Sequence, residues 1–182
     1  MSSSLAATVE GVEDQPRRTH RFWMLLALVT MPVLALDQLS KLYINSHFRL
    51  YETVPLVPNW LDVTYTLNPG AAFSLFATMP PGFRSVFFIV LSIVAIIVLA
   101  VLLTRPETSL ASSISFALIL GGTIGNLIDR LARSVVIDFI YFHHNSFSYP
   151  VFNVADSAIT VGVVIILLFS VMGDHQSGEK AA

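Results

Sequence analysis

Two aspartates with apolar neighbours are the residues of this chain best suited to chemistry. Asp138 lies in Val-Val-Ile-Asp-Phe-Ile (135–140), and Asp156 follows Phe-Asn-Val-Ala (152–155) at the start of a long apolar run. An ionised carboxylate in hydrocarbon costs about 2.5–3.5 kcal/mol even on lenient insertion scales, so such residues are candidates for function. Two carboxyls close together at low dielectric do not both ionise easily, and one keeps its proton. The pair would then supply a general base and a general acid.

A stripe of polar and small residues precedes Asp138 in the chain. Gly122, Asn126 and Arg130 recur every four residues, so on a helix they lie on one face, and Asp129 adjoins them. This spacing suggests that Arg130 pairs with Asp129 or binds substrate carbonyls through its planar fork of donors.

Two shorter spacings add to this pattern. Asp37 and Lys41 are four residues apart and can form an ion pair on a helix. Asn153 precedes Asp156 by three residues, which also fits a simple helix cap with an acid in the first turn. We expect a functional role for the second pair because Asp138 and the polar stripe lie nearby in the chain.

The composition predicts a membrane protein. Of the 182 residues, 54% are hydrophobic and only 12% are charged, against roughly 25% charged in soluble domains. The net charge of −2 gives no indication of a nucleic-acid partner, and the absence of cysteine excludes disulfides, thiolate metal sites and cysteine nucleophiles. Four apolar runs are long enough to span a bilayer, at 22–44, 83–103, 110–128 and 154–172.

The charges before the first run predict the orientation. Arg17, Arg18 and Arg21 favour a cytoplasmic N-terminus. A cleaved signal peptide is the alternative, but the run continues through Asp-Gln-Leu-Ser-Lys without a convincing cleavage site. We therefore expect a membrane domain at 17–172 with extracytoplasmic segments at 45–82 and 129–153. Residues 1–16 are expected to be a disordered cytoplasmic tail and 173–182 a second cytoplasmic tail. Alternating spans bring the polar residues to one membrane face.

The first external segment shows the pattern of a β-strand. Apolar and polar residues alternate from 61 to 67, and Asn-Pro-Gly follows at 68–70 as a turn signal. A small sheet there either carries an extended substrate or only covers the helix ends. The predicted fold class is an all-α polytopic membrane protein with four transmembrane helices. A small extracytoplasmic β-cradle lies between helices 1 and 2, and a short extracytoplasmic segment lies between helices 3 and 4.

Other catalytic chemistries have weaker support in the sequence. His143 and His144 are adjacent, so their side chains diverge, and the chain has no His-x-x-x-His spacing for a metal. Ser74 and Ser157 lack a His or Lys at a persuasive position for nucleophilic catalysis. We therefore expect neither a metal nor a cofactor.

Five motifs resemble, in order, those of lipoprotein signal peptidase (signal peptidase II). They are Asp-Gln-x-x-Lys at 37–41, Asn-Pro-Gly-Ala-Ala-Phe-Ser at 68–74, Gly-Gly-x-x-Gly-Asn-x-x-Asp-Arg at 121–130, Val-x-Asp-Phe at 136–139 and Phe-Asn-x-Ala-Asp-Ser at 152–157. The resemblance covers about residues 22–172. It implies an aspartic intramembrane endopeptidase of the bacterial inner membrane, with its active site at the extracytoplasmic face. Its substrates would be diacylglyceryl-prolipoproteins, cut before the lipidated cysteine.

By motif position, the resemblance implies that Asp138 and Asp156 form the catalytic dyad. The supporting positions of the other motifs fall on Asp37, Lys41, Asn68, Gly70, Gly122, Asn126, Asp129, Arg130, Asn153 and Ala155. The expected partners are prolipoproteins and membrane lipid, with no nucleic acid, and the expected state is a monomer.

Two other classes of protein could also use these residues. A small transporter or proton-relay subunit could use Asp37, Asp138 and Asp156 as relay groups. Such a relay should extend through the bilayer, yet the centres of the second and fourth runs (93–103 and 161–168) carry no ionisable residue. A non-catalytic assembly protein has no need for two acids in apolar surroundings.

Overall fold

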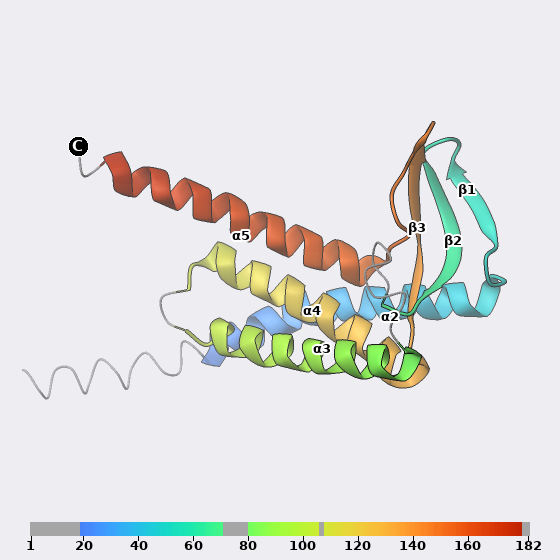
Figure 1. The fold of residues 1–182 in the computed structure, drawn as a ribbon. Helices are drawn as coiled ribbons and strands as arrows, with labels where there is room; N and C mark the ends of the chain where they lie inside the picture. Colours follow the sequence, from blue (N-terminus) through green and yellow to red (C-terminus); the bar gives the residue numbers. More distant parts are fainter. Residues whose placement is uncertain (1–18, 71–79, 106–107, 180–182) are drawn as a thin grey trace, which may run out of the picture.

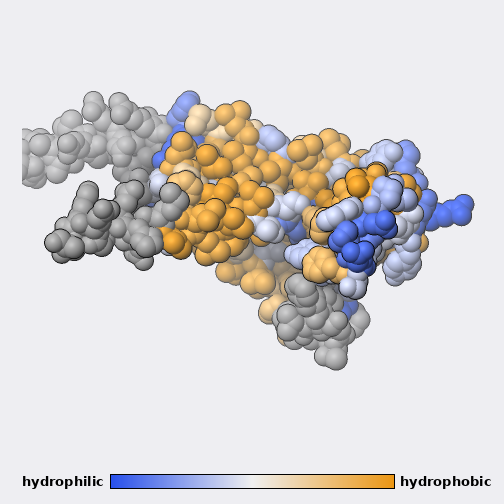
Figure 2. Space-filling model, turned by 90° about the horizontal axis from the view of Figure 1, so that it is seen from above, coloured by the Kyte–Doolittle hydropathy of each residue, from blue (hydrophilic) through white to orange (hydrophobic). Residues whose placement is uncertain are grey.

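The computed structural model describes residues 19–70, 80–105 and 108–179. Within these ranges, four helices are long and apolar enough to cross a membrane: Thr19–His47, Gly82–Leu103, Leu110–Arg133 and Val154–Val171. They coincide with the four predicted apolar runs. Apolar side chains cover the helical part of the face seen in Figure 2, and hydrophilic ones gather at the end that carries the sheet. The predicted polytopic membrane fold with a small sheet is confirmed in these features.

The helices run side by side, with the sheet standing at one end of them (Figure 1). The first helix contains a π-helical turn, η1 (Leu26–Thr30), before α2 (Met31–His47). It is followed by α3 (Pro81–Leu103), α4 (Leu110–Arg133) and α5 (Val154–Glu179). The last helix thus continues into the segment that was expected to be a C-terminal tail.

Helix α4 lies at the centre of the bundle. It packs against η1, α2, α3 and α5, and 44% of its membrane-length stretch is buried, against 17% in each of the other three helices. Helix α4 extends beyond the predicted end of its span at residue 128, so Asp129 and Arg130 are helical. A Cβ on Gly122 would clash with the backbone oxygen of Ala155, so only glycine permits this approach of α4 to α5.

The sheet has four antiparallel strands in the order β1 (Thr53–Val57), β2 (Leu61–Asn68), β3 (Val136–His144) and β4 (Phe147–Ser148). The strand predicted from the alternation at 61–67 is confirmed as β2. The short segment expected between helices 3 and 4 contains β3, which pairs along β2 and was not predicted as a strand. The β-branched and aromatic residues of 135–142 were a signal for this strand.

One face of the sheet packs on α2. Ile44 of α2 forms a buried cluster with Tyr65 of β2 and with Ile137 and Phe139 of β3. Because successive side chains of a strand point to opposite faces, Asp138 points away from this cluster. The apolar residues on either side of Asp138 therefore anchor the strand that carries it.

Candidate active site

Asp138 is held by two side-chain amides from different parts of the chain. The Nδ2 of Asn68 donates to Asp138 Oδ2 at 2.9 Å, and the Nδ2 of Asn153 donates to Oδ1 at 2.6 Å. The register of β2 and β3 pairs Thr66 with Asp138, which leaves Asn68 diagonally opposite on the same face. The structure thus brings together three of the predicted site residues, and the side chain of Asp138 is almost fully buried.

The environment of Asp138 favours its protonated form. Burial, and after it the nearby charge of Asp156, raise the pKa of Asp138 from 3.8 to about 7. The hydrogen bonds from Asn68 and Asn153 and the charge of Lys41 oppose this rise in the pKa of Asp138. A carboxyl that titrates near neutral pH can take up and release protons during a reaction.

Asp156 lies in the first turn of α5. Its Oδ1 accepts a 2.8 Å hydrogen bond from Asn126 Nδ2, and its backbone N–H donates at 2.9 Å to Asn153 Oδ1. The helix cap that fits the Asn153–Asp156 spacing is therefore present, and the nitrogen of the same Asn153 side chain binds Asp138. Within the described residues, Oδ2 of Asp156 accepts no hydrogen bond.

Asn126 connects the two aspartates to a buried lysine. Its Oδ1 accepts from Lys41 Nζ at 3.0 Å and from Asn153 Nδ2 at 3.2 Å. The same side chain donates to Asp156 from its nitrogen, so its amide dipole points from Lys41 toward Asp156. This network determines the orientation of both asparagine amides.

Lys41 lies between two buried aspartates. Its Nζ is 2.9 Å from Asp37 Oδ2 and 3.1 Å from Asp129 Oδ2, and the lysine side chain is 1% exposed. Arg133, which is partly exposed, pairs with Asp129 Oδ1 at 2.9 Å. Asp37 also accepts the Ala155 N–H at 2.9 Å, so the first helix binds the first turn of the last. These contacts compensate the desolvation of the buried charges.

The predicted ion pair of Asp37 with Lys41 is confirmed. Of the two alternatives for Arg130, the pair with Asp129 is not formed within the described residues, and the contact with substrate carbonyls stays a prediction. Asp129 faces Lys41 on α2, and Arg130 lies about 100° further round α4. The guanidinium of Arg130 donates to the Asn126 carbonyl oxygen at 3.3 Å and lies over the Phe88 ring, 5.2 Å from its centroid. The role of Arg133 was missed, although its i,i+4 spacing from Asp129 was a usable signal.

Three small residues of the motifs provide close backbone contacts. Gly70 has a φ of +93°, which favours glycine, and its N–H donates to Asn68 Oδ1 at 2.8 Å. This bond orients the asparagine whose nitrogen binds Asp138. Gly122 and the buried Ala155 form the close approach of α4 to α5 described above. Residues 71–74, the rest of the motif that begins at Asn68, lie outside the described residues. The structure therefore gives no contacts for Ser74.

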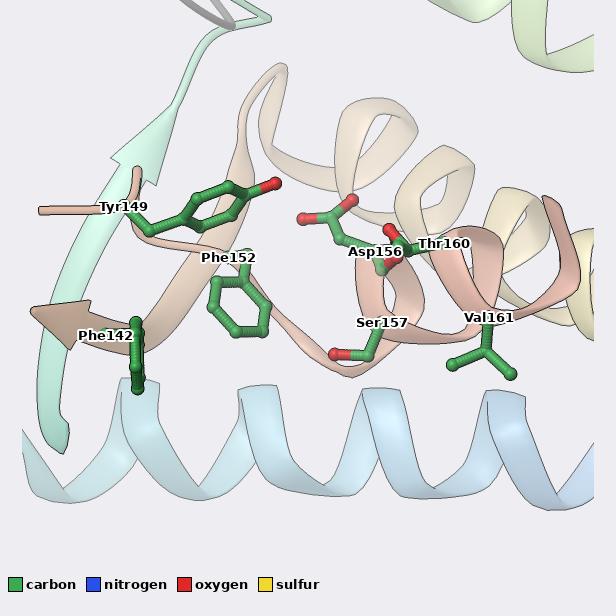
Figure 3. A pocket seen from close by; sticks show the side chains of 7 residues that line it. All are labelled: Phe142, Tyr149, Phe152, Asp156, Ser157, Thr160 and Val161. Carbon is green, nitrogen blue, oxygen red and sulfur yellow. Dashed lines mark hydrogen bonds between the residues drawn. The ribbon is translucent and has the colours of Figure 1, made fainter. Parts of the chain in front are cut away.

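Two hollows flank Asp156. The first has a volume of about 340 Å³ and is lined, besides Asp156, by Phe142, Tyr149, Phe152, Ser157, Thr160 and Val161 (Figure 3). The second has a volume of about 270 Å³ and lies between α3, α4 and α5, where its lining includes Phe88, Asn126 and Arg130. A peptide bond placed at Asp156 would therefore have space on both sides.

The residues considered for other chemistries have local partners. The Ser157 hydroxyl donates to the Asn153 carbonyl oxygen at 2.9 Å, inside the first turn of α5. His143 Nε2 lies 3.0 Å from Asp62 Oδ2 on β2, and the His144 ring stacks on Trp60 with centroids 3.8 Å apart. The two histidines thus belong to separate contacts on the sheet.

The comparisons with known proteins agree with this geometry. Residues 29–172 match the family model of Signal peptidase (SPase) II. The chain belongs to this family. It is therefore a membrane peptidase of the signal peptidase II family, whose members are of the aspartic type, and the family predicted from the five motifs is confirmed.

Several relatives cover most of the chain. The lipoprotein signal peptidase of Syntrophus aciditrophicus is 39% identical over 147 residues, which are 80% of this chain and 91% of the relative. That of Photorhabdus laumondii is 41% identical over 159 residues, 87% of this chain and 92% of the relative. A solved structure of a bacterial membrane enzyme, determined by the in meso method at 2.3 Å, is 28% identical to this chain and superposes with a TM-score of 0.71. The match covers 83% of this chain and 89% of the enzyme's chain.

Proposed function

We propose that this signal peptidase II cuts diacylglyceryl-modified prolipoproteins immediately before the lipidated cysteine, with Asp138 and Asp156 as its catalytic dyad. One observation carries the assignment of the dyad. Two carboxyls from β3 and α5 are tied into one network of asparagine amides, and burial together with Asp156 raises the pKa of Asp138 to about 7. The name of the relatives, lipoprotein signal peptidase, supports the substrate class.

The dyad works with a single shared proton. The ionised carboxylate takes a proton from a water molecule as the water oxygen adds to the scissile carbonyl carbon. The protonated carboxyl polarises the carbonyl oxygen, and a carboxyl proton then passes to the leaving nitrogen as the C–N bond breaks. The products are a signal peptide with a free carboxyl group and a lipoprotein with a free cysteine amine. This sequence consumes one water molecule and returns the dyad to its starting protonation state.

The surrounding amides prepare the dyad for this chemistry. Asn68 and Asn153 hold both oxygens of Asp138, whereas Asn126 holds only Oδ1 of Asp156. Oδ2 of Asp156 therefore faces the hollows as an available hydrogen-bond acceptor, which suits it to bind the attacking water. Groups held in place before the reaction cost no reorganisation when the charge moves.

The same proposal places the protein in the bacterial inner membrane, as a monomer with both termini in the cytoplasm. The sheet and the dyad then lie at the extracytoplasmic face, where water is available for hydrolysis. The acyl chains of the substrate lie between helices that open to lipid, and the peptide lies along the sheet. The buried charged residues Asp37, Lys41, Asp129 and Asp138 contact one another or one network at the sheet end, an arrangement that suits a single site rather than a relay across the bilayer.

The test is cleavage by the purified protein in detergent of a diacylglyceryl-modified prolipoprotein and its unmodified twin. A buried acyl chain contributes about 0.8 kcal/mol per CH₂, so the lipid should supply most of the energy that positions the scissile bond. We expect cleavage before the cysteine, very poor cleavage of the unmodified twin, and no cleavage of either by Asp138→Asn or Asp156→Asn. Equal rates on the two substrates would refute lipid recognition. A near-wild-type rate in either variant would remove that aspartate from the mechanism.

A further inference from the structure

The larger hollow beside Asp156, shown in Figure 3, is lined by one hydroxyl group that donates no hydrogen bond to the described residues. Three hydroxyl-bearing side chains line this space: Tyr149, Ser157 and Thr160. Ser157 donates to the Asn153 carbonyl oxygen at 2.9 Å, and Thr160 donates to the Asp156 carbonyl oxygen at 2.8 Å. Within the described residues, the Tyr149 hydroxyl makes no hydrogen bond.

The position of Tyr149 directs this hydroxyl to the dyad. The segment before α5 is tied to β3 by a hydrogen bond from the Tyr149 N–H to the Phe142 carbonyl oxygen at 2.9 Å. The Tyr149 ring packs edge-on against Phe152, with centroids 5.7 Å apart and an angle of 85° between the ring planes. Figure 3 shows that the ring extends into the hollow and that its hydroxyl points toward the Asp156 carboxylate.

A substrate carbonyl at this place needs a hydrogen-bond donor. The hollow is largely apolar, so a peptide oxygen that enters it loses water, and a buried acceptor without a partner is costly. The amides of Asn68, Asn126 and Asn153 already donate to the two carboxylates. Arg130 borders the other hollow, on the α3 side of Asp156. On the side of the sheet, Tyr149 is therefore the donor that remains among the described lining residues.

We propose that Tyr149 is a further catalytic residue of this peptidase, whose hydroxyl donates a hydrogen bond to the carbonyl oxygen of the scissile bond. The inference rests on the proposed dyad of Asp138 and Asp156. As water adds to the carbonyl carbon, negative charge develops on the carbonyl oxygen, and the hydrogen bond from Tyr149 strengthens. The phenol keeps its proton throughout. The proton of the water still goes to the ionised carboxylate, and the leaving nitrogen still receives its proton from the dyad.

Tyr149→Phe tests this role because it removes the oxygen and keeps the aromatic wall of the hollow. We expect kcat on the lipidated substrate to fall on the order of 100-fold, as for the loss of one oxyanion donor, with KM changed less than about twofold. The matched control is Tyr141→Phe, since Tyr141 also lies beside β-sheet aromatics, stacked on His143 at 4.9 Å, but does not line the hollow. This control should keep the wild-type kcat.

A second variant separates hydrogen bonding from packing. A fluorinated tyrosine at position 149 is a stronger donor of nearly the same shape, and at a pH where its phenol is protonated it should keep kcat at or above the wild-type value. A wild-type kcat in Tyr149→Phe, a loss expressed only in KM, or a kcat as low in the fluorinated variant as in Tyr149→Phe would each overturn the role.

Asp156→Asn is assayed in parallel, so the two assignments can fail separately. An inactive Asp156→Asn beside a fully active Tyr149→Phe rejects Tyr149 and leaves the dyad standing. An active Asp156→Asn rejects the dyad itself.

Discussion

Asn153 donates a 2.6 Å hydrogen bond to Asp138 from the same side chain that caps helix α5. Its oxygen satisfies an N–H at the beginning of α5, and its nitrogen holds a carboxylate on β3. The cap that positions Asp156 therefore also positions Asp138. A change at this residue alters the geometry of both aspartates together.

The two functions of Asn153 can be separated by substitution. Asn153→Asp keeps a good N-cap but replaces the donor with an oxygen that faces Asp138 and Asn126 Oδ1. We expect a fold stability close to that of the wild type at low pH and a loss of kcat of at least about 100-fold, in the range of acid–base effects. Asn153→Ala should lose the activity and also about 1 kcal/mol of stability from the cap. Cleavage rates and thermal unfolding in detergent measure the two effects, and an active Asn153→Asp would show that the amide is dispensable.

Activity should fall as the pH rises above about 7. Because the pKa of Asp138 is raised to about 7, the proposed dyad should lose its shared proton in that range. A profile of kcat/KM against pH measures this limb. A rate that stays constant from about pH 6 to about pH 9 would contradict a protonated Asp138 in the active form.

The same pKa has a consequence for stability. Because the folded-state pKa of Asp138 is raised above the ordinary value of 3.8, the folded protein binds more protons than the unfolded chain between about pH 4 and about pH 7. Asp138 therefore adds stability at the acid end of this window, and that stability is lost as the pH rises through 7. We expect the Tm of Asp138→Asn minus that of the wild type to increase from pH 4 to 7 and then to level off. A pH-independent difference would argue against the shift.

The buried lysine should matter more for stability than its exposed neighbour in the network. Lys41→Met removes the cation between Asp37 and Asp129, and breaking such a buried pair typically costs about 3–5 kcal/mol. Arg133→Met is the matched control, because Arg133 binds the same Asp129 but is 35% exposed. Its loss should cost about 1 kcal/mol or less. Chemical or thermal unfolding in detergent compares the stability of the two variants. Equal losses of stability would refute the larger contribution of Lys41.

Arg130 should not tolerate replacement by lysine. Its guanidinium combines a hydrogen bond to the Asn126 carbonyl oxygen with a cation–π contact over Phe88, and an ammonium group does not have the same fork of donors. Arg130→Lys should therefore reduce kcat/KM by about 10-fold, the equivalent of 1–2 kcal/mol of lost cation–π and hydrogen-bond energy. Full activity with Lys at this position would show that only the charge is needed.

Much of this arrangement could be predicted from the sequence. Apolar runs of membrane length have few alternatives, and the i,i+4 spacing was enough to pair Asp37 with Lys41. The pairing of Asp129 with Lys41 could not be predicted, because spacing along one helix does not tell which neighbouring helix faces the residue. Lys41 comes from α2, which is distant in the chain.

The strand β3 shows a second limit of prediction from the sequence. The alternation of apolar and polar residues predicts the strand β2, but the apolar run around Asp138 is not predicted as the strand that pairs with β2. Pairing between segments about 70 residues apart depends on how the helices bring them together, as the bond from Asn68 to Asp138 illustrates. Likewise, no sequence motif predicts the position of the Tyr149 hydroxyl, because that position depends on how the side chains pack.

The contact of Asp37 with the Ala155 N–H also has a consequence for biogenesis. Asp37, in the first helix to leave the ribosome, is an acceptor whose donor lies in the last helix. Asn126 of the third helix likewise has its hydrogen-bond partner, Asp156, in the last helix. A nascent chain that stops before residue 154 therefore lacks both Asp156 and the Ala155 N–H that binds the first helix to the last. With the proposed dyad of Asp138 and Asp156, proteolytic activity begins only when the fourth helix has been inserted, and partly synthesised chains would not cleave proteins in the membrane.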